Sequence, residues 1–169
     1  MDFFEVLGKR RSIRKFRQRE VEEEKLQKIL EACNRAPSAG NLQAYKIFVV
    51  RSQEKRESLA TVGRERGFFR EAPISLIFCA APEVSASLYG ERGKNLYSIQ
   101  DATIAAAYAQ LAATSQGLAT VWVGAFDEEK IKEIIGTDLK PVAILPLGYA
   151  AEEPEFTSRK SLKELTQGC

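Results

Sequence analysis

Residues Leu96 to Gln116 read LYSIQDATIAAAYAQLAATSQ, and this stretch decides the fold. It is rich in alanine and carries no charge from Ala102 onward, and Gly117 follows it as a helix-ending residue. A helix without a charged face is buried on all sides. In a chain of 169 residues the stretch therefore predicts a central helix, which lies either within one subunit or, the arrangement we favour, at the centre of a homodimer.

Shorter segments with strand or helix patterns lie before and after this helix in the sequence. Apolar runs bounded by turn residues predict four strands, at 45–50, 74–80, 119–123 and 142–147. Apolar spacing and capping residues predict helices at 22–35, 52–64 and 127–136, besides a short one at the N-terminus. We expect a loop at 82–95 and an extended polar tail from Gly148. Few strands among many helices indicate the α+β class, a small sheet with helices around it.

The composition limits the chemistry. One domain spanning residues 1–169 is expected, and a net charge of +2 gives no bulk attraction to nucleic acid or to a membrane. Histidine is absent, which excludes Ser-His-Asp and Cys-His catalysis and most zinc sites, so we expect a bound cofactor and no metal. Three cysteines without a CxxC pair, and no signal peptide, favour a cytoplasmic protein.

A basic segment stands out in this nearly neutral chain. Residues Lys9 to Arg19 read KRRSIRKFRQR, and seven of these eleven are Lys or Arg. Guanidinium groups around a serine suit a phosphate, because arginine offers a planar fork of donors and serine adds a hydroxyl. The alternatives are a solvated basic loop, or a non-enzymatic module that binds RNA or another anion.

Three further segments carry polar or flexible residues where elements end. APSAGNLQ at 36–43 is a loop whose short polar side chains suit a polyol or an aromatic edge. WVGAF at 122–126 contains Gly124, which lets a planar ligand approach the backbone. GYAAEEPEFTSRK at 148–160 brings a second basic site. Each also fits an ordinary turn or a solvated tail.

In this order and spacing the four segments resemble the nitroreductase family of flavin enzymes. RRSIRKF is similar to the family's Arg-x-Ser-x-Arg-x-Phe motif, and APSAGNLQ to its Ala-Pro-Ser-x-x-Asn-x-Gln segment. GLATVWVGAF is similar to Gly-Leu-Gly-x-x-Trp-x-Gly-x-Phe, and LPLGYAAEE to the Leu-Gly-Tyr-Pro-x-Glu tail. Ala44-Tyr45 stands where the family often has Pro-Trp.

The resemblance implies a nitroreductase-like fold, with a small mixed or antiparallel sheet and an intertwined homodimer that binds FMN at its interface. Arg10, Ser12 and Arg159 would hold the FMN phosphate, with Arg11 beside them. Arg14 would lie near flavin N1 and O2. The remaining implied contacts are Pro37, Ser38 and Asn41, of which Ser38 and Asn41 come from the partner subunit, and Val123 and Gly124 near N5 and O4. Arg14 and Gly124 would be the catalytic residues.

The implied activity is the oxidation of NADH or NADPH by a ping-pong cycle that reduces nitroaromatics, quinones or similar small aromatic acceptors. Dehalogenation or flavin modification are alternatives within the same fold. We rank them lower because a loop at 82–95 leaves little room for the helical excursion that covers the site in longer family members.

Overall fold

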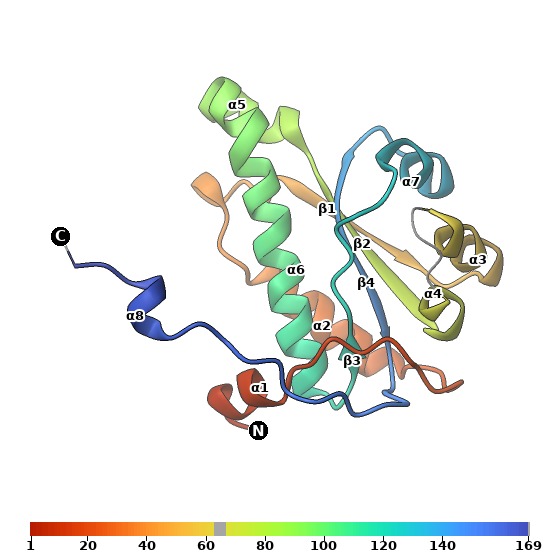
Figure 1. Ribbon diagram of the computed structural model, residues 1–169. Coiled ribbons are helices and arrows are strands. Elements are labelled where there is room, and N and C mark those ends of the chain that lie inside the picture. Colours follow the sequence, from red (N-terminus) through yellow and green to blue (C-terminus); the bar gives the residue numbers. More distant parts are fainter. Residues whose placement is uncertain (63–66, 169) are drawn as a thin grey trace.

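The computed structural model describes residues 1–62 and 67–168 (Figure 1). Its helices are α1 (Phe3–Lys9), α2 (Glu23–Asn34), η1 (Ala39–Asn41), α3 (Gln53–Thr61), α4 (Phe68–Glu71), α5 (Pro82–Arg92), η2 (Gly93–Tyr97), α6 (Ser98–Ser115), α7 (Glu128–Ile135) and α8 (Leu162–Leu165). Its strands are β1 (Tyr45–Val50), β2 (Ile74–Ala80), β3 (Ala119–Thr120) and β4 (Lys140–Gly148). This is the α+β class expected from the sequence.

The sheet is antiparallel throughout, in the order β1-β2-β4-β3. At its centre Ile77 of β2 lies opposite Phe48 of β1 and Ile144 of β4. All seven residues of β2 are buried, because helices cover both faces of this strand. Alternation along β2 therefore sends Leu76 into one core and Ile77 into the other.

Figure 1 shows the two layers of helices, with α6 and α2 on one side of the sheet and α3, α4 and α7 on the other. The first core joins α2 and α6 to the sheet, and the second joins α3, α4 and α7 to it. A small third cluster (Ile13, Phe16, Ala72 and Ala119) lies beneath the basic segment, Lys9–Arg19. The protein therefore anchors that segment to its core.

Helix α6 packs on the sheet through alanines. Ala102, Ala105, Ala106, Ala109 and Ala113 are buried, and their small side chains let the helix approach the strands closely. Its opposite face is not covered within the chain: Tyr108 is 39% exposed. The expectation of a helix buried on all sides is thus wrong for a single chain.

The expected loop at 82–95 is the clearest error of sequence interpretation. This segment forms α5 and the π-helical turn η2, which lead directly into α6. Pro82 starts α5 in a helix-compatible conformation. The turn η2 packs tightly against α5 at Gly93. A Cβ at this position would lie only 2.4 Å from the Ser85 carbonyl oxygen, so a side chain would not fit there. The argument that this chain has no room for a helical excursion therefore fails.

The limits of the other helices and strands differ less from the predicted ones. β1 and β2 occupy the predicted residues, whereas regular pairing of β3 stops at Thr120 and resumes only as a bridge between Val123 and Ile144. Helix α3 ends at Thr61, and the rest of the predicted 52–64 helix lies partly outside the described residues. The C-terminal tail, residues 149–168, is extended as expected but contains α8, which is capped by Ser161. Within residues 1–62 and 67–168, no helix has the length and apolarity needed to span a membrane.

Candidate functional site

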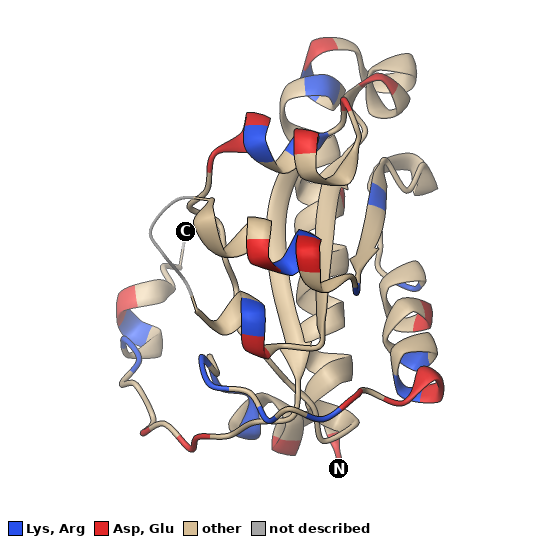
Figure 2. Ribbon diagram, turned by 90° about the vertical axis from the view of Figure 1, so that its right-hand side faces the viewer, with Lys and Arg blue, Asp and Glu red and all other residues tan. Residues whose placement is uncertain are grey.

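The basic segment runs as an extended chain beside β3 and the first residues of the C-terminal tail. Ile13 N–H donates to the Thr120 carbonyl (3.1 Å), and Arg17 N–H donates to the Tyr149 carbonyl (2.9 Å). Ala151 N–H donates in return to the Lys15 carbonyl (2.9 Å). Figure 2 shows the segment as a nearly continuous blue stretch low in the molecule, with red at the glutamates that follow it.

Two distant carboxylates hold the backbone of the same segment. A Glu71 oxygen accepts from Phe16 N–H at 3.0 Å, and a Glu152 oxygen accepts from Arg14 N–H. These glutamates therefore bind main-chain amides and leave the guanidinium groups available for a ligand. Sequence interpretation did not assign a role to either one, since their partners lie 55 and 138 positions away in the chain.

The two basic sites of the sequence meet in one pocket of about 250 Å³, here called the arginine pocket. Its lining residues are Arg10, Arg11, Ser12 and Arg14 from the basic segment and Pro154, Glu155, Phe156, Thr157 and Arg159 from the tail. The Arg11 guanidinium lies 4.9 Å from the centre of the Phe156 ring. This cation–π contact helps to hold the tail against the basic segment.

The arginine pocket has an excess of positive charge. It contains four guanidinium groups and one carboxylate, that of Glu155. In the described part of the chain, none of those four arginines forms an ion pair. Burial lowers the pKa of Arg10, and the nearby charges of Arg159 and Arg11 lower it further. An anion in the pocket would relieve this repulsion.

The Ala36–Gln43 loop lies at the other end of α6. Pro37 and Ser38 line a separate hollow of about 500 Å³ together with Asp101 and Tyr97, while Asn41 is exposed nearby. Thr114, near the opposite end of α6, lines a groove with Arg11 and Ile13. Asp101 and Thr114 are 13 positions apart, which corresponds to about 20 Å along a helix. One chain therefore does not bring this loop to the arginine pocket.

Val123 and Gly124 differ in what they can offer a ligand. Val123 is buried, and both of its backbone groups pair with Ile144, by a 3.0 Å and a 2.9 Å hydrogen bond. Gly124 is exposed, and a Cβ there would lie 3.3 Å from the indole nitrogen of Trp122. Of this predicted pair, Gly124 has the accessible backbone.

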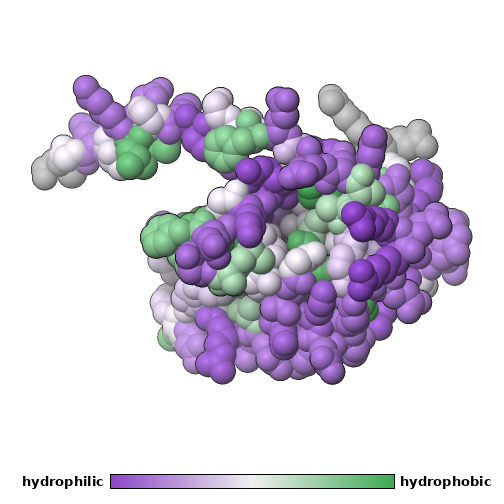
Figure 3. Space-filling model, turned by 90° about the horizontal axis from the view of Figure 1, so that it is seen from below, coloured by the Kyte–Doolittle hydropathy of each residue, from purple (hydrophilic) through white to green (hydrophobic). Residues whose placement is uncertain are grey.

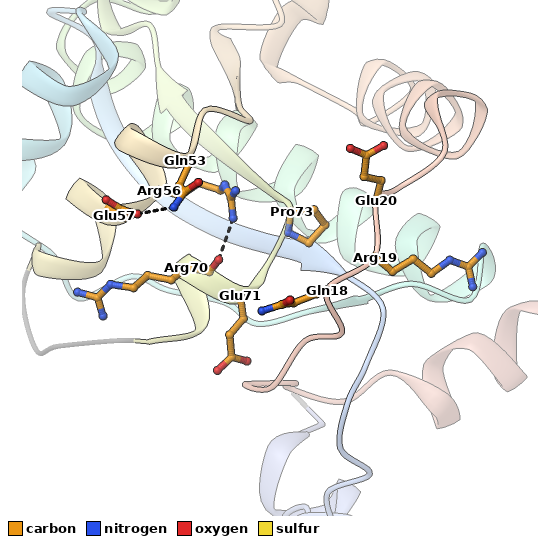
Figure 4. Close-up of a pocket in the computed structure, with 9 residues that line it drawn as sticks. All are labelled: Gln18, Arg19, Glu20, Gln53, Arg56, Glu57, Arg70, Glu71 and Pro73. Carbon is orange, nitrogen blue, oxygen red and sulfur yellow. Dashed lines mark hydrogen bonds between the residues drawn. The ribbon is translucent and has the colours of Figure 1, made fainter.

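A second charged hollow, of about 330 Å³, lies between the basic segment and α3 (Figure 4). Arg56 donates there to the carbonyls of Arg70 (2.8 Å) and Ala72 (2.9 Å). In Figure 4 the side chains of Arg19, Glu20 and Arg70 point away from one another. The hollow therefore does not converge on a ligand as the arginine pocket does.

Two of the three cysteines are buried in the core. Cys33 and Cys79 are buried, and burial raises the pKa of each thiol to about 12, so neither is a thiolate at neutral pH. Over residues 1–62 and 67–168 no group of three or more His, Cys, Asp and Glu side chains could hold a metal ion.

Comparison with known proteins agrees with these observations. A sequence model described as the Nitroreductase family matches residues 7–67 and 61–149. A Methanothermobacter thermautotrophicus protein, provisionally named NADH dehydrogenase/NAD(P)H nitroreductase, is 36% identical over 91% of this chain and 80% of its own length. A nitroreductase family protein from Clostridium novyi is 34% identical, with a TM-score of 0.82 over 90% of this chain and 87% of its own.

The chain therefore belongs to the nitroreductase family, and its fold is that of the family. A further solved relative, from Vibrio harveyi, is described as an NADPH:FMN oxidoreductase complexed with NAD+. It superposes with a TM-score of 0.89 at 26% identity, over 98% of this chain and 76% of its own.

Proposed function

We propose that this chain is an FMN-dependent oxidoreductase that takes electrons from NADH or NADPH and passes them to nitroaromatics, quinones or similar acceptors in a ping-pong cycle. The convergence of Arg10, Ser12 and Arg159 on one pocket carries the proposal. Named relatives support it: a Bacillus subtilis FMN reductase [NAD(P)H] is 33% identical over 84% of this chain.

The arginine pocket fits the phosphate of FMN. Its uncompensated guanidinium charge and the Ser12 hydroxyl are the donor types that bind a phosphate dianion. FMN, when bound, supplies a ring that accepts a hydride and returns it. Arg10, Ser12 and Arg159 hold the phosphate in this proposal, and Arg11 fixes the tail that contributes Arg159.

Arg14 and Gly124 have the roles nearest to the chemistry. Arg14 supplies the cation that stabilises negative charge on the reduced ring, and its backbone is fixed by Glu152 for that purpose. The exposed amide of Gly124 orients the ring edge. Neither role requires a protein acid or base, in accord with the absence of histidine.

We also propose that the active unit is a homodimer. Ser38 lies beside Asp101 at one end of α6, whereas Thr114, about 20 Å further along the helix, lies beside Arg11 of the arginine pocket, so in this proposal a second copy brings Ser38 and Asn41 to the flavin. The uncovered face of α6 around Tyr108 and the exposed Phe4 of α1 (79%) provide apolar surface for that contact. Leu162 of the C-terminal tail is a further exposed apolar residue.

The visible spectrum of the purified protein tests the proposal. A flavin band that bleaches when NADH or NADPH is added anaerobically is expected. A colourless protein that takes up no added FMN would contradict it. A mobility-shift assay with RNA at low salt addresses the alternative of an anion-binding module, which requires retention that weakens steeply as salt rises.

A further inference from the structure

The Ala36–Gln43 loop has an unusual backbone. Gly40, Asn41 and Gln43 have φ angles of 57°, 56° and 45°, all in the left-handed region. Two of these residues are not glycine, and side chains disfavour that region. Such a conformation persists only where the surrounding structure fixes it, so the contacts of the loop identify what holds it in place.

Two of these contacts come from a buried carboxylate on α6. Asp101 is 2% exposed. One of its oxygens accepts from Ala39 N–H at 2.9 Å and the other accepts from Ala44 N–H at 3.4 Å. Among the described residues no Lys or Arg pairs with it. Its charge is therefore compensated by main-chain amides on either side of the left-handed residues, from Ala39 before them and Ala44 after them.

The chemistry of this contact needs a carboxylate. Two amides approach from different sides, and a carboxylate of this length has one acceptor oxygen for each of them. Asparagine has the same shape but a single acceptor oxygen, so its NH₂ group would face one of the two amide donors. A buried N–H left without an acceptor costs more than an ordinary hydrogen bond contributes.

We infer that Asp101 is a positioning residue of the active site, which fixes the Ala36–Gln43 loop so that Ser38 and Asn41 are presented to the flavin of the partner subunit. Asp101 and Ser38 line the same hollow, and Ser38 Oγ accepts from Gln43 N–H at 3.0 Å, which closes the loop from within. This inference rests on the proposed function.

The test compares Asp101→Asn with Ser98→Ala. Ser98 is also buried, lies one turn earlier on α6, and donates its hydroxyl to the Lys94 carbonyl of the preceding turn η2, away from the loop. Amide hydrogen exchange of the flavin-free proteins is measured residue by residue. The affinities of FMN and riboflavin are then measured by quenching of flavin fluorescence.

For Asp101→Asn we expect the amides of Ala39 and Ala44 to exchange at least about tenfold faster, with little change elsewhere. FMN and riboflavin should both bind about tenfold more weakly, because the loop touches the flavin away from its phosphate. Ser98→Ala should change neither property.

Unchanged exchange at Ala39 and Ala44, or faster exchange spread evenly over the whole protein, would overturn the inference. So would local loosening with flavin affinities equal to those of the wild type. If the wild-type protein binds neither flavin, the proposed function fails, whereas the exchange rates still decide whether Asp101 holds the loop.

Discussion

The two ends of α6 support proposed ligand contacts in different ways. At the end near Thr114, the basic segment is fixed by strand-like pairing with Thr120 and Tyr149, and its cations remain exposed to a ligand. At the end near Asp101, a short loop with left-handed residues is held by one buried carboxylate. The first end gathers four guanidinium groups at one pocket, as the proposed phosphate site requires, and the second holds a loop with left-handed residues in place.

The two ends of α6 should therefore respond differently to substitutions. A site held by many backbone bonds should lose affinity only when its charges are removed. A site held by one side chain should lose its shape when that side chain changes. Because the two ends lie about 20 Å apart along one helix, the proposed dimer is what would bring both to one flavin.

The largest effect is expected from separating the subunits. Tyr108→Glu places a charge on the uncovered face of α6 and should convert a dimer to a monomer, with loss of FMN binding. Light scattering after size-exclusion chromatography measures the mass. The control Gln53→Glu adds the same charge on α3, on the other side of the sheet, and should leave the mass unchanged. A Tyr108→Glu protein that stays dimeric would show that this face is not the interface.

Removal of a phosphate contact should have the next largest effect. Arg10→Ala is expected to weaken FMN binding by about 1.5–3 kcal/mol, roughly tenfold to a hundredfold, as for a hydrogen bond to a charged group. Riboflavin, which lacks the phosphate, should bind with unchanged affinity. Equal losses for FMN and riboflavin would place Arg10 elsewhere than at the phosphate.

A smaller effect is expected from Glu152, which holds the backbone of Arg14. Glu152→Ala removes that acceptor and should slow anaerobic reduction of the flavin by NADPH about tenfold, corresponding to about 1.4 kcal/mol. Stopped-flow absorbance measures this rate. Glu152→Gln keeps an acceptor oxygen and should recover most of the rate, and a failure to recover would mean that the charge of Glu152 matters rather than its bond to Arg14.

The smallest effect concerns pH and the start of α2. The Tyr149 hydroxyl donates to Glu22 at 2.5 Å, and this bond is the largest of the causes that together lower the pKa of that carboxyl from 4.5 to about 2; the others are a backbone hydrogen bond of Glu22, Arg19 and Lys25. Because the pKa is depressed in the folded state, the stabilisation is present above about pH 4.5 and is lost as the pH falls toward 2. Tyr149→Phe should raise the pKa of Glu22 toward 4.5, which carboxyl NMR can follow. An unchanged pKa would assign the shift to the backbone hydrogen bond of Glu22 and to Arg19 and Lys25 instead.

The sequence predicted those elements whose signals are local. The strands 45–50 and 74–80 are apolar runs bounded by turn residues, and their limits are confirmed. Asp127 and Gly136 likewise mark the ends of α7: the Asp127 side chain accepts from Lys130 N–H, and Gly136 has a φ of 67°. Helix α5 was missed because its apolar signal is short: Val84 and Leu88 share one face but are exposed, and the buried residue of the helix is the polar Ser85.

In the candidate site too, some residues could be predicted from the sequence and others could not. The dense group of arginines with Ser12 is visible in the sequence alone, and in the structure it lines one pocket with Arg159, while the phosphate role of these residues stays a prediction. Glu71 and Asp101 act through bonds to main-chain amides 55 to 62 positions away, which no local pattern encodes. The one available signal was Asp101 itself, the last charge before the uncharged stretch of α6.

Parallel titration of the flavin-free protein with FMN and with riboflavin tests the central claim most directly, since these ligands differ only in the phosphate. If Arg10, Ser12 and Arg159 form the phosphate site, FMN should bind at least about a hundredfold more tightly, which corresponds to about 2.7 kcal/mol. Equal affinities for the two flavins, or no binding of either, would contradict the account.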